Sequence, residues 1–375
     1  MHIPVCTPVL AGNEIKYVTD AVESGWISSS GKYVPAFEQA FAAYCGAKHA
    51  IAVCNGTAAL HLALTAMGIG PGDEVIIPDF TMAASAFAVC YTGATPVFAD
   101  ADAKSWNIDV SAVESAITPA TKAVMPVHIF GNPCAMQRLN TVAKQHNLLV
   151  LEDAAEAHGA MYNGKRTGAL GDIAAFSFFA NKNITTGEGG MVVTNDDTLA
   201  ERCRYFKNLC FPLREARLYL HEDIGFNYRM SNIHAALGLA QTEKAEDYRN
   251  MRIRNGLLYR KLLSSVKGLT FQEKEIGGDC VYWMNGVLVH PEAYGCGRDE
   301  LTAHLARLGI ETRNFFNGMH RQPALKKYGC DCSGSFPVSD RLADNGFYLP
   351  SGSGLTEEEI TYICEATATF SERRS

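Results

Sequence analysis

A lysine in an unusual setting is the first residue of this chain that could do chemistry. Lys182 follows the apolar stretch 176–180 and precedes a polar, glycine-rich turn at 183–190. Apolar and small neighbours remove water from an ammonium group, which lowers its pKa and favours a Schiff-base role. The same neighbours would also surround a lysine that extends from a strand end into solvent. The lysine therefore needs partners before a function can be assigned.

An acidic residue at the end of a second apolar run is the next candidate. Leu148-Leu149-Val150-Leu151 leads directly into Glu152-Asp153. Open α/β sheets bind their ligands at the carboxyl ends of their strands, where Asp153 would lie. A carboxylate there could pair with a protonated ring nitrogen, cap a helix, or bind a metal together with Glu152, Glu156 and His158.

A short turn supplies the third candidate. Asn55-Gly56-Thr57 lies between an expected strand and an expected helix, where free backbone N–H groups and the helix dipole attract an anion. The glycine clusters 68–72 and 187–190 precede strands instead, the reverse of a dinucleotide-binding fingerprint, which argues against a Rossmann dehydrogenase. A phosphate cradle, a strand-end acid and a semi-buried lysine are together the three parts that a pyridoxal phosphate enzyme requires.

Composition excludes several other classes. The chain has 375 residues, 47% hydrophobic and 19% charged, with a net charge of -7 and no basic run. These values exclude disorder and argue against a nucleic-acid surface. No apolar run reaches the roughly 18 residues of a membrane span, and the first residues do not resemble a signal peptide. The 12 cysteines form no CxxC pair, which predicts reduced thiols, no metal and a cytoplasmic protein.

The elements that must position these residues alternate between strands and helices. This alternation predicts an α/β fold with a mostly parallel sheet. We expect strands at 50–54, 74–78, 95–99, 123–127, 148–152, 173–179, 191–194 and 281–289. Two helices are expected from their apolar faces, one with Ile15, Val18 and Val22 and one with Phe37, Phe41 and Tyr44. Further helices are expected over 60–67, 136–145, about 230–263, 298–308 and the C-terminus. Thr356 and Glu359 predict a capping box at the last of these.

With these motifs in order, the chain resembles the nucleotide-sugar aminotransferases of the DegT/StrS type, a branch of the fold-type I pyridoxal phosphate enzymes. The resemblance covers nearly the whole chain and rests on segments 25–31, 55–60, 152–155, 176–178, 181–182, 227–232, 309–313 and 349–351. It implies an aspartate aminotransferase-like fold, with a large sheet domain and a small C-terminal α/β domain. The expected division is an N-terminal helix and substrate loop at 1–30, a cofactor domain at 31–245, and a connector with the small domain at 246–375.

The resemblance also implies a role for individual residues. Lys182 would hold pyridoxal 5'-phosphate and move the migrating proton, and Asp153 would pair with the ring nitrogen. The cofactor would also contact Gly56, Thr57, Ala58, Met82, Glu156 and Ser177, and Asn227 would reach it from the second subunit of a homodimer. The nucleotide-sugar pocket would include Lys182 together with Trp26, Ser28, Ser29, Arg229, Arg313 and His320.

Two positions depart from the family pattern. Met82 stands where many relatives carry an aromatic residue that stacks on the cofactor ring, so either a thioether contact replaces stacking or Phe80 compensates. Glu156 stands where glutamine is common and adds a negative charge. The turn 185–190 and the segment 221–230 resemble relatives that aminate sugar C4. The implied acceptor is GDP-4-keto-6-deoxymannose, with L-glutamate as donor; the alternative is a UDP- or dTDP-linked 4-keto-6-deoxyglucose.

Three competing interpretations follow from the same residues. A related dehydratase carries histidine in place of the lysine, and Lys182 counts against it. A non-catalytic regulatory protein on this fold would not need the set of Lys182, Asp153 and Ser177. A metal enzyme would use Asp153, Glu156 and His158, whose spacing matches no known ligand pattern.

Overall fold

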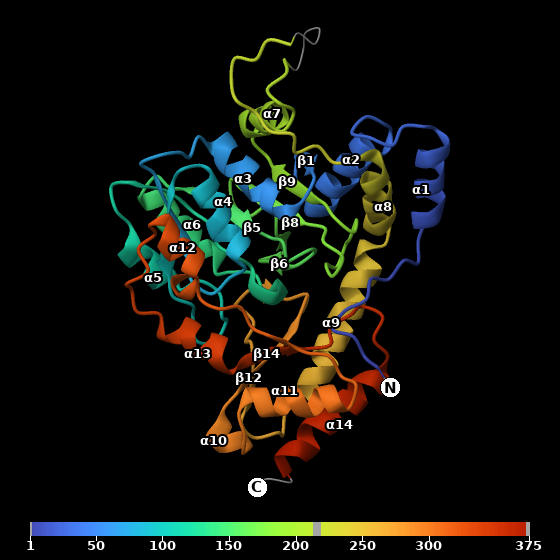
Figure 1. Cartoon of the computed structure of the whole chain (residues 1–375), viewed down its shortest axis with the longest axis vertical. Helices are drawn as coiled ribbons and strands as arrows, with labels where there is room; N and C mark the ends of the chain where they lie inside the picture. The colour runs from blue at the N-terminus through green and yellow to red at the C-terminus, as the bar shows by residue number, and fades with distance from the viewer. Residues whose placement is uncertain (1, 213–218, 373–375) are drawn as a thin grey trace.

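A seven-stranded sheet forms the centre of the larger part of the molecule. The computed structural model describes residues 2–212 and 219–372. In Figure 1 this sheet lies above a smaller unit that holds the C-terminus. Its strand order is β1-β9-β8-β5-β4-β2-β3. The strands are β1 (His49–Val53), β2 (Glu74–Pro78), β3 (Thr95–Ala99), β4 (Thr121–Val124), β5 (Leu149–Asp153), β8 (Ile173–Ser177) and β9 (Gly190–Thr194).

All strands of this sheet except β9 run parallel. β9 pairs antiparallel with both β1 and β8, whereas the pairs among β2, β3, β4, β5 and β8 are parallel. The carboxyl ends of six strands therefore share one edge of the sheet, where ligands of such folds bind. The predicted α/β class with a large, mostly parallel mixed sheet is confirmed.

Helices cover both faces of the sheet. One face packs against α3 (Gly56–Met67), α4 (Ala83–Tyr91) and α7 (Asp197–Phe206). The other packs against α1 (Glu14–Glu23), α2 (Tyr33–Cys45) and α8 (Asn232–Glu243) on one half, and α5 (Val110–Ala116) and α6 (Met136–Gln145) on the other. Burial on both faces explains why the strands read as unbroken apolar runs in the sequence.

The long helix α9 (Ala245–Leu262) connects this part to the C-terminal sheet (Figure 1). That sheet has the order β10-β12-β14-β13, with strands β10 (Leu269–Phe271), β12 (Asn285–Val289), β13 (Arg313–Asn314) and β14 (Gly346–Leu349). It packs with α9, α11 (Arg298–Arg307) and α14 (Glu357–Glu372). The remaining elements are short: β6 (Met161–Tyr162), β7 (Lys165–Arg166), β11 (Gly278–Asp279), α10 (Pro291–Tyr294), α12 (Pro323–Tyr328), α13 (Pro337–Asn345) and the 3-10 turns η1 (Ile129–Gly131) and η2 (Met319–Arg321).

The predicted capping box at the last helix is confirmed. The backbone N–H of Thr356 donates to Glu359 Oε2 at 2.9 Å, and the Glu359 N–H donates to Thr356 Oγ1 at 3.1 Å. This reciprocal pair satisfies two amides that the first helical turn leaves without intrahelical partners.

The structure corrects three details of the sequence prediction. The strand expected at 281–289 begins only at Asn285, because Tyr282 has a φ of 50° that interrupts extended backbone. The helical stretch from 230 to 263 divides at Lys244 into α8 and α9. On α1, Ile15 is 84% exposed and Val22 is 54% exposed, so of the apolar face expected there only Val18 packs against the core of its own chain.

The predicted domain division remains a prediction. Of the strands above, those of the large sheet lie within 49–194 and those of the C-terminal sheet within 269–349. None of the helices between residues 2–212 and 219–372 combines the length and hydropathy needed to cross a bilayer.

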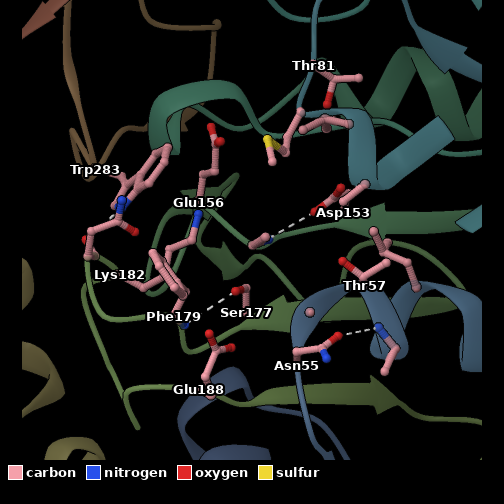
Figure 2. A pocket seen from close by; sticks show the side chains of 18 of the residues that line it. Asn55, Thr57, Thr81, Asp153, Glu156, Ser177, Phe179, Lys182, Glu188 and Trp283 are labelled. Atoms are coloured by element: carbon pink, nitrogen blue, oxygen red, sulfur yellow. Dashed lines mark hydrogen bonds between the residues drawn. The ribbon is translucent and has the colours of Figure 1, made fainter. Parts of the chain in front are cut away.

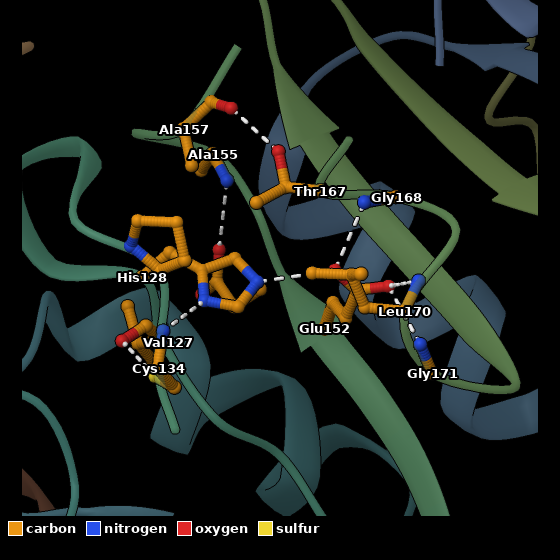
Figure 3. A network of polar contacts seen from close by, with 12 residues as sticks. Val127, His128, Cys134, Glu152, Ala155, Ala157, Thr167, Gly168, Leu170 and Gly171 are labelled. Carbon is orange, nitrogen blue, oxygen red and sulfur yellow. Dashed lines mark hydrogen bonds and ion pairs between the residues drawn. The ribbon is translucent and has the colours of Figure 1, made fainter. Parts of the chain in front are cut away.

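A buried polar network fixes the carboxyl end of β5. Glu152 is fully buried, and its carboxylate accepts hydrogen bonds from the backbone N–H groups of Gly168, Leu170 and Gly171 at 2.7–2.9 Å (Figure 3). His128 Nδ1 accepts from the Cys134 N–H, so its Nε2 carries the proton that it donates to Glu152 at 3.1 Å. Four donors therefore hold one carboxylate immediately before Asp153.

Replacement of Glu152 by alanine should destabilise the protein strongly. Four buried donors would lose their acceptor, and removal of one member of a buried charged network costs about 3–5 kcal/mol. Urea unfolding followed by circular dichroism measures the change. Glu246→Ala is the matched control, because Glu246 pairs with Arg166 at the surface and such pairs contribute less than about 1 kcal/mol. An equal loss in both variants would contradict the role of the network.

Candidate active site

A cavity of 620 Å³ opens at the carboxyl edge of the large sheet. This volume is within the range of roughly 300–1,000 Å³ that holds small-molecule ligands. The cavity brings together the turn after β1, the end of β5, the end of β8 and the loop after it (Figure 2). The expected site residues among its lining are Gly56, Thr57, Ala58, Met82, Asp153, Glu156, Ser177 and Lys182.

The turn after β1 has the form of an anion site. Asn55 caps α3, its side chain accepting from the Ala58 N–H at 2.8 Å. The first amides of a helix have no intrahelical partner and attract negative charge. Gly56 approaches β8 so closely that an added Cβ would lie 2.6 Å from the Cβ of Ser177. Only glycine therefore allows the helix N-terminus and the Ser177 hydroxyl to share one small space, which has the size and donors for a phosphate group.

Asp153 ends β5 and is 4% exposed. Its carboxylate accepts from Ser85 Oγ at 2.8 Å and from the Ala155 N–H at 3.2 Å. Burial raises the pKa of Asp153, although the Ser85 and Ala155 hydrogen bonds and the positive charge of Lys182 oppose this shift. A buried carboxylate that faces a cavity with so few donors is stabilised by a cationic N–H group, such as a protonated ring nitrogen.

Lys182 reaches the same cavity from the loop between β8 and β9. Its Nζ lies 3.6 Å from the centroid of the Trp283 ring, a cation–π contact (Figure 2). Burial lowers the pKa of Lys182, and the negative charges of Glu156 and Asp153 oppose the shift. A lowered pKa increases the fraction of free amine, the form that acts as nucleophile and base.

Glu156 is held by a strained turn on the cavity wall. Its Oε2 accepts from the Phe130 N–H at 2.7 Å, and Phe130 has a φ of 55° although it is not glycine. Backbone strain of this kind persists where the surrounding structure enforces it, often at functional sites. Burial raises the pKa of Glu156, and the charge of Lys182 opposes the shift. The charge of each of these two groups therefore favours the charged form of the other.

The structure separates the two explanations for the missing aromatic residue. Met82 lines the cavity and is 54% exposed. Phe80 is fully buried and packs against Phe130, Phe315 and Phe316. It does not line the cavity, so it does not take the place of the aromatic residue. The thioether of Met82 is the side chain available at that position.

Apart from Lys182, the expected nucleotide-sugar residues do not line the cavity in the single chain. Arg229 donates to the side chains of Asn227 and Asn208, and Arg313 is exposed beside Glu311. The ring nitrogens of His320 face Asp79 at 2.8 Å and Asp340 at 3.2 Å. The remaining expected residues, Trp26, Ser28 and Ser29, lie in the segment after α1. Asn232 donates hydrogen bonds to the backbone carbonyls of Trp26 and Ser28 in this segment. These assignments stay predictions.

Asn227 also lies outside the cavity of its own chain. It is exposed, and its Oδ1 accepts from Arg229 Nε at 3.0 Å. The next residue, Tyr228, does line the cavity and bonds His61 Nδ1 through its hydroxyl at 2.9 Å.

Sequence reasoning missed several lining residues. Trp283 lies in a stretch expected to be a strand, which gave no indication of a site. Ser85 lies outside the lining and reaches the site through its hydrogen bond to Asp153. Tyr228 and Glu188 were inside quoted motifs but received no role. Phe179, Phe316 and Tyr348 complete the aromatic part of the lining. A pattern of buried aromatic residues gives no signal in a single sequence that separates a core position from a cavity wall.

The metal interpretation gains no support from the geometry. Across residues 2–212 and 219–372 there is no cluster of three or more His, Cys, Asp or Glu side chains that could hold a metal. His158 packs its ring against Phe41, Phe176 and Phe178, and burial lowers its pKa to about 3. It is thus a neutral side chain within an aromatic cluster.

Comparisons with known proteins agree with this geometry. Residues 8–368 match the DegT/DnrJ/EryC1/StrS aminotransferase family. A GDP-perosamine synthase of Caulobacter vibrioides is 47% identical, covering 97% of each chain. A GDP-perosamine synthase of Escherichia coli O157:H7 is 45% identical, covering 98% of each chain. The structure of Spr1654 from Streptococcus pneumoniae in its PLP form superimposes with a TM-score of 0.92 at 27% identity, covering 100% of each chain.

Proposed function

Because the chain belongs to the DegT/DnrJ/EryC1/StrS aminotransferase family, we propose that it aminates C4 of GDP-4-keto-6-deoxymannose to form GDP-perosamine, with L-glutamate as amino donor. The observation that carries the acceptor is the 45–47% identity to two GDP-perosamine synthases over nearly the full length of the chain. The chemistry is that of a nucleotide-sugar aminotransferase that depends on pyridoxal phosphate.

The residues of the cavity fit this cofactor. The α3 N-terminus and Ser177 offer donors to its phosphate, the Asp153 carboxylate matches a protonated ring nitrogen, and the Lys182 amine can bind its aldehyde. When bound, pyridoxal phosphate supplies a carbonyl that carries the amino group between donor and acceptor, and a ring that withdraws electrons.

The protein side chains then have distinct tasks. Lys182, with its lowered pKa, holds the proton that must reach or leave sugar C4. Asp153 keeps the ring nitrogen protonated through its negative charge. The buried ring of Trp283 covers one side of the lysine amine and excludes water there, and Met82 lines the same cavity.

We also propose a homodimer in which Asn227 completes the partner's cofactor site. Asn227 does not line the cavity of its own chain. Apolar side chains remain exposed at the cavity rim, where Met82 is 54%, Tyr91 59% and Phe179 47% exposed. Exposed apolar residues that gather in one place indicate an interface, and a second copy would cover them while it delivers Asn227.

A test of the acceptor compares three compounds in separate assays. The purified protein, loaded with pyridoxal phosphate and given glutamate, should release 2-oxoglutarate fastest with GDP-4-keto-6-deoxymannose. The UDP- and dTDP-linked 4-keto-6-deoxyglucoses should react at least about 100-fold more slowly, because a lost set of polar contacts costs at least about 3 kcal/mol. Preference for either glucose-configured compound would support transamination at C4 but contradict GDP-4-keto-6-deoxymannose as the acceptor. No release with any of the three would contradict C4 amination itself.

A further inference from the structure

A buried arginine lies next to the reactive lysine without a negative partner. Arg252, on α9, is 1% exposed. Among the described residues, no carboxylate lies within ion-pair distance of its guanidinium. Its donors go instead to the carbonyls of Asn181, Trp283 and Ser351, to Ser353 Oγ and to Cys6 Sγ. A buried cation that is satisfied only by neutral groups is costly, so its position calls for a reason beyond stability.

The contacts of Arg252 converge on the backbone around Lys182. The carbonyl of Asn181, the residue before Lys182, accepts from Arg252 Nη2 at 3.3 Å and from Trp283 Nε1 at 3.0 Å. Cys6 Sγ also lies 3.5 Å from this carbonyl. The guanidinium therefore fixes the peptide from which the lysine side chain departs.

The same guanidinium holds the aromatic ring that the lysine contacts. Arg252 Nη1 donates to the Trp283 carbonyl at 2.8 Å, and the Lys182 Nζ lies over the indole of Trp283. Its remaining bonds reach Ser351 and Ser353, in the segment that follows β14. One planar donor group thus ties the lysine loop to two segments of the C-terminal part, a geometry that an ammonium group cannot reproduce.

We propose that Arg252 is the positioning residue of this site: it sets where the Lys182 amine lies by fixing both the lysine backbone and the Trp283 ring. The inference rests on the proposed function in one respect, namely that Lys182 is a catalytic residue. The contacts themselves are independent of which sugar is the acceptor.

Loss of this arrangement has a defined consequence for the lysine. The charged groups that act on Lys182 come from several elements: Glu156 and Asp153 favour its protonated form, as does Cys6, whereas Arg252 disfavours it. Burial, together with the positive charge of Lys182, lowers the pKa of His158 and keeps its imidazole neutral. Removal of the guanidinium charge, together with greater access of water to a loosened lysine, favours the protonated amine.

Competitive labelling measures this directly in the full chain without cofactor. Trace acetic anhydride is added over a range of pH, and the acetylated Lys182 peptide is quantified by mass spectrometry against peptides of surface lysines. In Arg252→Gln, the pH midpoint of Lys182 labelling should move upward, and the labelling rate at high pH should rise as the amine becomes exposed. Arg252→Lys keeps the positive charge but loses the planar set of guanidinium donors. The pH midpoint of Lys182 labelling should therefore move less than in Arg252→Gln, whereas the labelling rate at high pH should still rise.

The matched control is Arg254→Gln. Arg254 lies on the same helix and donates to the Leu355 carbonyl near the same C-terminal segment. It does not bond the backbone of Asn181 or Trp283 in the described contacts, so its replacement should leave Lys182 labelling unchanged. Equal labelling of Lys182 in the parent and in Arg252→Lys and Arg252→Gln would overturn the proposal, as would an equal change in Arg254→Gln. If Arg252→Gln does not fold, the Arg252→Lys result decides. No acceptor is used, so failure of the sugar assay leaves this test intact.

Discussion

Replacement of Lys182 by alanine is expected to abolish transamination while the fold persists. The amine is the one group in the cavity placed both to bind the cofactor aldehyde and to move a proton at sugar C4. Loss of general acid–base catalysis alone removes a factor of about 10²–10⁴, and loss of covalent attachment adds to it. Among the described residues the Lys182 amine contacts the Trp283 ring, an interaction that contributes about 0.5–2 kcal/mol. The free energy of unfolding of the Lys182→Ala variant should therefore differ little from that of the parent protein.

Two measurements check this expectation. Release of 2-oxoglutarate from glutamate reports turnover, and mass spectrometry after borohydride reduction reports cofactor bound covalently to the chain. Parent protein should gain the mass of reduced cofactor on the Lys182 peptide, and Lys182→Ala should gain none. Turnover by Lys182→Ala would contradict the assignment of Lys182 as the cofactor-binding lysine, as would an active variant with reduced cofactor attached to another residue.

The same variant tests the shared site when it is mixed with Asn227→Ala. If Asn227 acts across a symmetric dimer, random exchange of equal amounts creates one intact site in half of the dimers, restoring about a quarter of parent activity. If Lys182 and Asn227 instead serve the site of the same chain, the mixed dimers contain no intact site and no activity is restored.

Asp153→Asn is expected to lower the rate by roughly 10² to 10⁴-fold, since breaking a buried ionic pair costs about 3–5 kcal/mol. The amide retains the shape of the carboxylate: its oxygen can accept from the Ala155 N–H, and its NH2 group can donate to Ser85 Oγ. It lacks the charge that keeps a ring nitrogen protonated. Steady-state kinetics with the loaded enzyme measure the loss, which should fall on kcat.

Stability distinguishes this effect from damage to the fold. Burial raises the pKa of Asp153 in the folded chain. A raised carboxyl pKa means that the folded state binds the proton more tightly than the unfolded state, so ionisation destabilises the chain at pH values above the unfolded pKa. The asparagine variant without cofactor should therefore melt no lower than the parent at pH 7. Asp172→Asn, which alters a carboxylate that accepts from Val150 outside the cavity, should leave the rate unchanged. A normal rate in Asp153→Asn would remove Asp153 from the mechanism.

The parts of the site that follow from sequence are those fixed by local pattern. Asn55, Gly56, Asp153 and Ser177 stand where an apolar strand ends, and a parallel sheet brings such ends to one edge whatever the long-range details. Lys182 follows the same logic, since it comes five residues after the end of β8. These positions could be predicted because the direction of the strands alone places them together.

The parts that could not be predicted depend on contacts between distant segments. Trp283 reaches Lys182 because Tyr282 adopts a positive φ that breaks the expected strand. Phe80 is too deeply packed among phenylalanines to replace the missing aromatic residue, which no spacing reveals. Asn227 needs a second chain to meet a cofactor site, and a single sequence carries no sign of which surface that chain covers.

The pairing of β1 bears on how the protein is made. β1 lies at the sheet edge, and its one neighbour in the sheet order is β9, with Val53 opposite Gly190. The ribosome must add 137 residues between those two positions, which takes about 7–27 s at ordinary synthesis rates. Throughout that time the β1 segment and the apolar helix α3 after it emerge without their native cover. The turn after β1 and the start of α3 are thus synthesised well before the strand that covers β1, and they stay without that cover in the nascent chain until β9 is made.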